Sequence, residues 1–332
     1  MRIASIIGLV TGLVSLIGLI AWQGVADIAD VMFRSDWRML LVPLVWLPTL
    51  FMNARCWQLL FHPDRTPRFW PIFYAQWMGR AVNTLLPVAS IGGEIVKARV
   101  VILWGANRDD ASAATVVDKT VQVITTILWG LIGVSLLAWI TLDDTMVLSA
   151  SITIATLGAG VAGFLVVQKA GMFHLAVSTA HRVTKSDYFG DMIGAAGAID
   201  ARIHDTYRQR GRLAAAVTWR MAALVMQTGE VWLAAYLLGY PISVVEALFI
   251  KSLTSTLSDA AFVVPNSYGV QEGAFVILGG FVGWTPDVAL AISLVVRIRE
   301  IVIDIPGLIL WQHAEGRALF KRRQAAKDGE SI

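Results

Sequence analysis

The chain of 332 residues is 56% hydrophobic and 15% charged, with a formal net charge of +3. Soluble domains carry about 25% charged residues, so this composition indicates a polytopic membrane protein. A single cysteine, Cys56, excludes an internal disulfide and a cysteine-cluster metal site. The five histidines lie in or beside polar segments, so we expect no metal and no cofactor. The positive charges sit in loops and at the C-terminus, so we expect no nucleic-acid partner.

Six apolar segments reach or nearly reach the length needed to cross a hydrocarbon core of about 30 Å. They cover residues 3–22, 38–60, 113–140, 146–168, 213–238 and 286–312. The first segment has only Arg2 before it, and Gly24-Val25-Ala26 imitates a signal-peptide cleavage site. Because its apolar run of about 20 residues is longer than a usual signal core, we favour a retained helix over a cleaved signal peptide.

Positive charge in the loops predicts the orientation of the chain. The loop 169–212 carries seven Lys and Arg residues, and the tail 317–332 is also basic. Both are expected in the cytoplasm, so we predict an integral protein of a bacterial inner membrane with both termini inside. Because each full span changes the side of the membrane, residues 69–112 must then enter and leave at the inner face. Residues 245–283 must likewise enter and leave at the outer face.

These two segments share an unusual sequence motif, in which a proline is followed by glycine and then by a glutamate seven residues after the proline. Proline and glycine break helices, and a carboxylate in hydrocarbon costs about 2.5 kcal/mol or more. Such breaks are tolerated within protein or beside a wet cavity. We therefore predict two re-entrant helical hairpins, with Glu94 and Glu272 near their tips. The residues expected to shape them are Pro87, Gly92, Gly93, Pro265 and Gly269.

The predicted fold is all-α, with about six full spans and two re-entrant hairpins arranged as inverted-topology repeats. The expected units are a first repeat at 1–140 (hairpin 69–112), a second repeat at 141–168 and 213–316 (hairpin 245–283), a cytoplasmic or interfacial insert at 169–212, and a basic cytoplasmic tail at 317–332. The stretch Ile193 to Arg210 of the insert mixes alanines with charges. It is either a solvated helix or one attracted to anionic lipid heads.

The last predicted span contains charges that hydrocarbon would not tolerate, namely Arg297, Arg299, Glu300 and Asp304. On a helix, Arg297 and Glu300 can pair, and they share an arc of about 60° with Asp304, whereas Arg299 points elsewhere. One interpretation is a self-neutralising pair that locks helix packing. The other is an arginine that clamps the phosphate of a lipid head group, since guanidinium suits that anion.

Two further segments are too polar to face lipid. The third span opens with Asp118 and Lys119, where Lys119 either snorkels to the membrane edge or has a functional role. Residues 251–259 (KSLTSTLSD) are expected to line a cavity through Lys251 and Asp259. The serines and threonines between them could instead only hold helices together.

The first hairpin adds a third group of candidates. Arg80 and Asn83 precede its proline, and Lys97 follows Glu94 on the returning arm. A helix that starts near Gly93 would direct free N–H groups at an anion. Glu94 is therefore either a simple helix-start carboxylate or a residue for gating, proton coupling or head-group binding.

At these motifs the chain resembles the transmembrane, flippase-like region of the lysylphosphatidylglycerol synthase family. The residues that carry the resemblance are Asn83-Thr84-Leu85-Leu86-Pro87, Gly92-Gly93-Glu94, Asp118-Lys119, and Pro265 with Gly269-Val270-Gln271-Glu272-Gly273. Where that family shows an acidic–arginine pair, this chain has Asp118-Lys119. The stretch 264–280 is most similar to the branch associated with hopanoid biosynthesis.

In that family the aminoacyl-transferase activity belongs to a separate soluble domain. Only about 20 residues follow the last predicted span, so we expect no such activity here. A GxxxxGK[ST] motif is also absent from the sequence, which gives no sign of an ATP-driven pump.

The sequence therefore predicts a lipid transporter or flippase rather than an enzyme. It would move a lipid or its head group, such as a hopanoid, another polyprenyl-derived lipid or a phospholipid, through a polar chamber between the hairpins. We expect Glu94→Gln and Glu272→Gln to abolish transport while leaving the protein inserted. The alternatives are an intramembrane transferase in lipid or hopanoid biosynthesis, and a scaffold for such enzymes that acts through the loop 169–212. The sequence leaves the oligomeric state and the energy source open.

Overall fold

The computed structural model describes residue 38, residues 41–86, 92–141, 188–261 and 267–327, and five isolated positions between 145 and 159. The predicted first span, most of the fourth span and the first part of the insert lie outside the described residues, as do Pro87 and Pro265. Within the described ranges every regular element is a helix, which confirms the all-α prediction. The number of spans stays a prediction.

The described elements are α3 (Leu41–Trp46), α4 (Pro48–Leu59), the 3₁₀ helix η2 (Pro63–Arg65), α5 (Phe69–Leu85), α6 (Gly92–Leu103), α7 (Arg108–Thr141), α10 (Tyr188–Arg208), α11 (Arg210–Leu237), α12 (Val244–Ala260), α13 (Val270–Gly280) and α14 (Pro286–Lys327). Among them, the helix Arg108–Ile140 is long and apolar enough to cross a membrane, judged by length and composition alone. The predicted span 38–60 is interrupted after Trp46, because Pro48 begins α4 without an amide hydrogen to donate. α14 continues without a break beyond the predicted span end at 312 and contains Pro306.

Two helix starts follow from local side-chain caps. The Ser243 hydroxyl accepts a hydrogen bond from the Glu246 N–H at 3.2 Å, and the Glu246 carboxylate accepts one from the Ser243 N–H at 2.7 Å. This capping box fixes the start of α12. At α7 the Asn107 side chain accepts from the N–H groups of Asp109 and Asp110, at 3.0 and 3.1 Å. α7 therefore begins at Arg108, before the predicted span start at 113.

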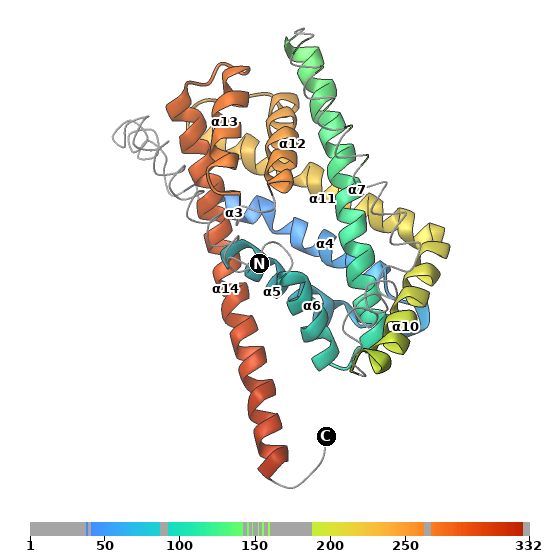
Figure 1. The fold of residues 1–332 in the computed structure, drawn as a ribbon. Coiled ribbons are helices and arrows are strands. Elements are labelled where there is room, and N and C mark those ends of the chain that lie inside the picture. The colour runs from blue at the N-terminus through green and yellow to red at the C-terminus, as the bar shows by residue number, and fades with distance from the viewer. Residues whose placement is uncertain are drawn as a thin grey trace.

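Each proline motif joins a pair of short antiparallel helices. α5 and α6 pack together at one end of the molecule, and α12 and α13 pack together at the other end (Figure 1). The helices have 17 and 12 residues in the first pair and 17 and 11 in the second. All are shorter than the about 20 residues of a full crossing. The helical hairpins are thus observed, and their re-entrant placement in a bilayer stays a prediction.

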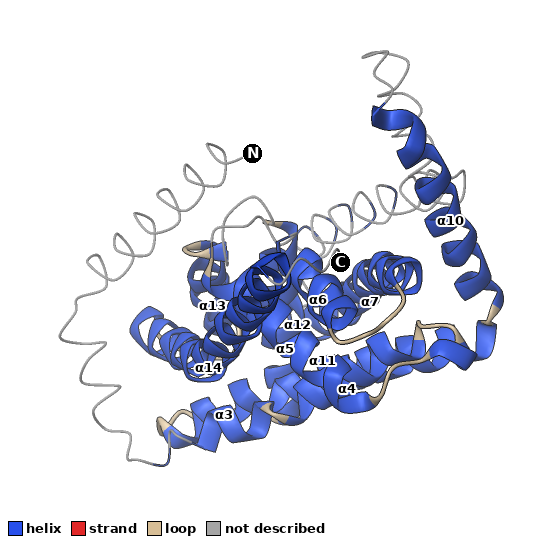
Figure 2. Ribbon diagram, turned by 90° about the horizontal axis from the view of Figure 1, so that it is seen from below, coloured by secondary structure: helices blue, strands red, loops and turns tan. Residues whose placement is uncertain are grey.

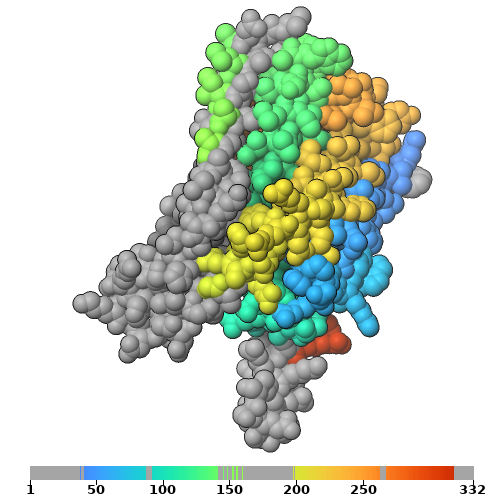
Figure 3. Space-filling view, turned by 90° about the vertical axis from the view of Figure 1, so that its right-hand side faces the viewer, coloured from blue at the N-terminus to red at the C-terminus, as the bar shows by residue number. Residues whose placement is uncertain are grey.

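The two long helices α7 and α14 run in opposite directions between these ends (Figure 1). Each leaves one hairpin and packs on the other, because α7 follows α6 and contacts α12, and α14 follows α13 and contacts α5. α3, α4 and α11 lie along one side of the bundle (Figure 2). On that side α11, in yellow, runs between α4, in blue, and α7, in green (Figure 3). This crossed packing ties the two hairpins into one bundle.

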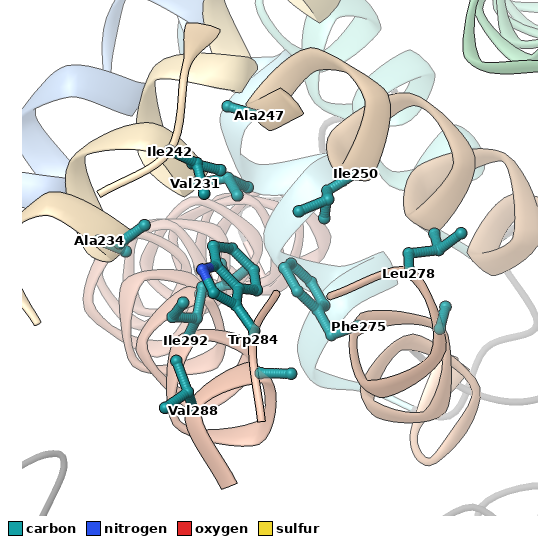
Figure 4. Packing of buried hydrophobic residues seen from close by; sticks show 14 of the residues in the cluster. Val231, Ala234, Ile242, Ala247, Ile250, Phe275, Leu278, Trp284, Val288 and Ile292 are labelled. Carbon is teal, nitrogen blue, oxygen red and sulfur yellow. The ribbon is translucent and has the colours of Figure 1, made fainter. Parts of the chain in front are cut away.

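The apolar core is divided into two clusters, one at each hairpin. In the cluster at the second hairpin, the rings of Trp284 and Phe275 lie together among Val231, Val288 and Ile292 (Figure 4). The largest fully buried side chains of the cluster at the first hairpin include Trp46, Trp57 and Phe61. Such clusters are close-packed and resist deformation.

The charged residues of two long helices fall between the two clusters. On α14, Val296 belongs to one cluster and Ile303 to the other, and Arg297, Arg299 and Glu300 lie between them. On α11, Ala216 belongs to one cluster and Val231 to the other, and between them lie Arg220 and Glu230. The middle of the bundle is therefore a polar waist, which we define by these five charged residues and their partners.

The first hairpin closes through a contact between glycines. A Cβ added at Gly93 would lie 2.0 Å from the Gly79 carbonyl oxygen. The Asn83 side chain also accepts a hydrogen bond from the Gly93 N–H at 2.7 Å. α5 and α6 can approach this closely only because both positions lack a side chain.

We expect Gly93→Ala to lower the free energy of unfolding by about 1–3 kcal/mol, because the new methyl group forces the hairpin apart. Thermal unfolding of the purified protein in detergent, followed by tryptophan fluorescence, measures the effect. Gly273→Ala is the matched control, since it lies in α13 with no heavy atom within 4 Å of an added Cβ. It should be neutral or stabilising by about 1 kcal/mol or less. If both variants and the wild type unfolded at the same temperature, the close approach of α5 and α6 at Gly93 would be contradicted.

Candidate functional site

A cavity of about 570 Å³ lies where the two hairpins meet the long helices. This volume is within the range of about 300–1,000 Å³ found for ligand sites. Its charged lining residues are Arg80, Glu94, Lys97, Lys119, Arg220, Lys251, Asp259, Arg299 and Glu300. Six of them are basic and three are acidic, so the lining has a surplus of three positive charges. The rest of the polar lining consists of amide and hydroxyl side chains such as Asn83, Gln122 and Ser255.

The structure brings nine of the twelve predicted site residues to the wall of this cavity. These are Arg80, Asn83, Glu94, Lys97, Lys119, Lys251, Asp259, Arg299 and Glu300. The other three, Asp118, Glu272 and Arg297, lie behind the wall and hold lining residues in place. A role of any of them in binding or translocation stays a prediction.

Asp118 of α7 is the centre of the first charge cluster. It is 2% exposed, and it accepts hydrogen bonds from Lys97 Nζ and Arg220 Nη2, both at 2.5 Å. Lys97 also contacts Glu94 at 2.6 Å, and Arg220 Nη1 donates to Asn53 Oδ1 at 2.8 Å. The arginine partner of Asp118 therefore comes from α11 and not from the next residue of its own helix. The cluster joins α4, α6, α7 and α11.

Lys119 lies on the cavity side of α7. Its Nζ donates to Gln122 Oε1 at 3.1 Å and lies 3.8 Å from Glu94 Oε1. Its side chain is 35% exposed, so the ammonium group remains accessible from the cavity. Lys119 is the basic group of the wall with the longest ion-pair distance among the described residues.

Glu230 of α11 is the centre of the second cluster and is fully buried. It accepts a hydrogen bond from Lys251 of α12, and Arg299 Nε of α14 lies 2.7 Å from its Oε2. The guanidinium of Arg299 stacks on the ring of Trp46, 4.6 Å from its centroid. Arg80 of the first hairpin lies over the same ring at 4.1 Å. A single tryptophan thus interacts with a cation of the first hairpin and a cation of α14.

Glu272 and Arg297 fix the start of α13. Glu272 accepts a hydrogen bond from the Gly269 N–H at 2.7 Å and one from Arg297 Nε at 2.7 Å. Arg297 Nη1 also donates to Glu300 at 3.0 Å, so the predicted contact between these two residues is confirmed. Gly269 has a φ of 80°, a conformation that favours glycine, and the guanidinium of Arg297 packs on the Tyr268 ring.

Asp304 connects α14 to the first hairpin. It is fully buried and accepts a hydrogen bond from Arg80 Nε at 3.1 Å. One residue earlier, the Ile303 carbonyl accepts from Trp77 Nε1 at 2.9 Å. Asp304 was predicted on the same side of the helix as Arg297 and Glu300, but its ion-pair partner is Arg80 of α5.

Sequence reasoning missed Arg220, Glu230 and Trp46. Both charged residues lie inside the apolar segment 213–238. The rule that marks the charges of the last span as functional candidates applies equally to them. Trp46 carries no such signal, because a tryptophan in an apolar segment is common in membrane proteins.

The formal charges of the site are equal in number, but they are not evenly distributed between the cavity wall and the protein behind it. The described residues contribute seven cations (Arg80, Lys97, Lys119, Arg220, Lys251, Arg297 and Arg299) and seven anions (Glu94, Asp118, Glu230, Asp259, Glu272, Glu300 and Asp304). Four of the anions and one of the cations lie behind the wall. The cavity therefore presents positive charge to its contents while the surrounding protein stays neutral. Among the described residues, no group of three His, Cys, Asp or Glu side chains could hold a metal ion.

Helical hairpins around a charged cavity are typical of helical membrane proteins. The family model for the lysylphosphatidylglycerol synthase transmembrane region matches residues 5–307, and the chain belongs to this family. Membership places the chain in a membrane and its role with membrane lipids. Comparisons with curated proteins and with solved structures found no match.

Proposed function

We propose that the protein is a flippase that moves a lipid head group across the bacterial inner membrane. The observation that carries this proposal is the positively charged cavity between two helical hairpins at opposite ends of the bundle. A head group would cross inside the cavity while the tails stay in lipid, because moving acyl chains through water is unfavourable. Lipid transport accounts for a polar chamber of this size without catalytic chemistry.

The lining favours an anionic head group such as a phosphate. Arg80, Arg299 and Lys119 are the wall residues best suited to it, because guanidinium and ammonium groups form charge-assisted hydrogen bonds with phosphate. The candidate lipids are a phospholipid and a hopanoid or other polyprenyl-derived lipid. The similarity of residues 264–280 to the hopanoid-associated branch supports the second group.

The proposed topology is a pair of inverted repeats with both chain termini in the cytoplasm. The order of a helix, a hairpin and a long helix occurs twice, and the long helices run in opposite directions. Asp110 supports the orientation, because it lies 3.7 Å from Arg65 and 3.3 Å from Arg202 of α10. α10, which is the described part of the insert, and the loop 62–68 therefore lie at the same end of the bundle, in agreement with the positive-inside rule.

Glu94→Gln should reduce lipid transport at least about tenfold while the protein stays folded. Glu94 lines the cavity, and the substitution removes a charge-assisted contact with Lys97 at 2.6 Å, an interaction of about 1.5–3 kcal/mol. Transport is measured with purified protein in vesicles of phosphatidylethanolamine and phosphatidylglycerol that contain fluorescent phosphatidylglycerol. Loss of fluorescence to an external quencher reports the arrival of the probe in the outer leaflet.

Glu315→Gln is the control, because Glu315 pairs with Arg99 at 2.5 Å outside the cavity wall. It should transport like the wild type. Normal transport by Glu94→Gln would make Glu94 a structural residue only. If vesicles with the wild-type protein transported lipid no faster than empty vesicles, the flippase proposal would be wrong. Formation of a new lipid in these vesicles would favour an intramembrane transferase. Glu272→Gln is less informative, because Glu272 is buried behind the wall and holds the start of α13.

A further inference from the structure

Asp259 differs from every other charged residue of the cavity wall. The other eight each have an ion-pair partner within 4.0 Å, whereas the described residues supply none for Asp259. Its Oδ2 accepts a hydrogen bond from the Thr126 hydroxyl at 2.8 Å. Asp259 lies one residue before the end of α12, beside the turn of the second hairpin, and is exposed to the cavity.

The contact between Asp259 and Thr126 is part of a row that attaches the second hairpin to α7. Further from the turn, Trp129 Nε1 donates to Ser255 Oγ at 3.1 Å. Further still, Gly133 lies so close to α12 that an added Cβ would come within 2.6 Å of a serine oxygen. In this row Asp259 is the only residue with an ionisable carboxyl group.

The first hairpin is attached to α14 by a different kind of bond. There Arg80 and Asp304 form an ion pair at 3.1 Å, in which the charge of the aspartate is matched by an arginine. The second hairpin is held at the corresponding contact with α7 by a carboxylate and a neutral hydroxyl. A hydroxyl donates to a carboxylate and accepts from a carboxylic acid, so Thr126 can satisfy Asp259 in both protonation states.

The groups that face Asp259 link its proton to the contents of the cavity. Lys119 of α7, Arg220 of α11 and Lys251 of α12 line the same cavity, and nearby positive charge favours a carboxylate over a carboxylic acid. On α13, Glu272 is buried behind the cavity wall and is bound by Arg297. An anion that enters the cavity neutralises the cations, and Asp259 then gains affinity for a proton. By linkage, a proton on Asp259 strengthens anion binding by the same factor.

We propose that Asp259 carries the proton that couples lipid movement to the proton gradient. The proton comes from the water of the cavity and adds to a carboxylate oxygen, which becomes a neutral carboxylic acid. Protonation replaces the charge-assisted bond to Thr126 with a weaker neutral one and loosens the second hairpin from α7. An anionic head group and a proton then move together, which avoids exposing an uncompensated carboxylate to hydrocarbon. This inference rests on the flippase proposal and supplies its energy source.

Asp259→Asn tests the coupling, because asparagine mimics the protonated side chain and keeps an oxygen for Thr126. In the vesicle assay with fluorescent phosphatidylglycerol, a pH gradient should accelerate the wild type several-fold, and a protonophore should remove the acceleration. Asp259→Asn should transport at one rate with and without the gradient. Asp287→Asn, at the start of α14 and outside the cavity wall, is the matched control and should respond like the wild type.

Infrared difference spectra between alkaline and acidic pH provide a measurement that does not need transport. The wild type and Asp287→Asn should show a carboxylic acid carbonyl band that Asp259→Asn lacks. If lipid transport did not respond to the pH gradient and no infrared band depended on Asp259, the proposed proton site would be wrong and the flippase proposal would stand. The band without any lipid transport would overturn the flippase proposal and the coupling with it. If a sodium gradient accelerated lipid transport and a pH gradient did not, the coupling ion at Asp259 would be sodium, and the proposal of proton coupling would be wrong.

Discussion

Glu230→Ala should lower the free energy of unfolding by about 3–5 kcal/mol, because removing one partner leaves buried charges uncompensated. Glu230 is fully buried and is the ion-pair partner of both Lys251 and Arg299. Among the described residues Lys251 has no other ion-pair partner, and Arg299 keeps only Glu300 at 3.7 Å. The loss is measured as a drop in Tm of the purified protein in detergent, from tryptophan fluorescence.

Two variants show whether the orphaned charge is the cause. Glu315→Ala breaks an ion pair whose side chains are 42% and 23% exposed, and pairs of this kind contribute about 1 kcal/mol or less. Adding Lys251→Met to Glu230→Ala removes one orphaned charge and should recover part of the stability. A Tm for Glu230→Ala equal to that of Glu315→Ala would contradict the buried charge cluster.

The second large effect is expected for Asp118→Ala, with a loss of about 3 kcal/mol, at the lower end of the range for breaking a buried pair. The loss is smaller than for Glu230 because the two cations keep other contacts. Lys97 still contacts Glu94 at 2.6 Å, and Arg220 still donates to Asn53 at 2.8 Å. The same unfolding measurement applies.

A double-mutant cycle with Lys97→Met isolates the pair itself. The Asp118 and Lys97 substitutions together should be less destabilising than the sum of the two, with a coupling of about 0.5–3 kcal/mol. Strict additivity would mean that the contact at 2.5 Å contributes nothing to folding.

Local patterns were sufficient to predict much of the architecture. Gly269, Glu272 and the preceding proline predicted a break between two helices, and α12 and α13 are observed on either side of it. The spacing of Arg297 and Glu300 predicted their contact, because residues three apart share a helix face. These features depend on residues close together in the sequence, so one sequence is sufficient to predict them.

Partners that come from distant helices could not be predicted in this way. Asp118 is bound by Arg220, 102 residues away, and Asp304 is bound by Arg80, 224 residues away. Which carboxylate meets which cation depends on how α11 and α14 cross the hairpins. The sequence marked Asp118 and Arg80 as unusual without indicating that Asp118 lies behind the cavity wall. Arg220 shows the other kind of omission, because a charge inside the apolar segment 213–238 is by itself a sign of a functional candidate.

The polar waist between the two apolar clusters determines how the two ends of the bundle are coupled. Interlocking side chains in a close-packed cluster lose many contacts at once when they slide. The ion pairs of the waist, which include Arg220, Glu230 and Arg299, are buried as well, and separating one of them leaves a charge without compensation. A tilt of one end of the bundle against the other must therefore exchange these ion pairs, and a charged cargo held in the cavity can supply the new partner.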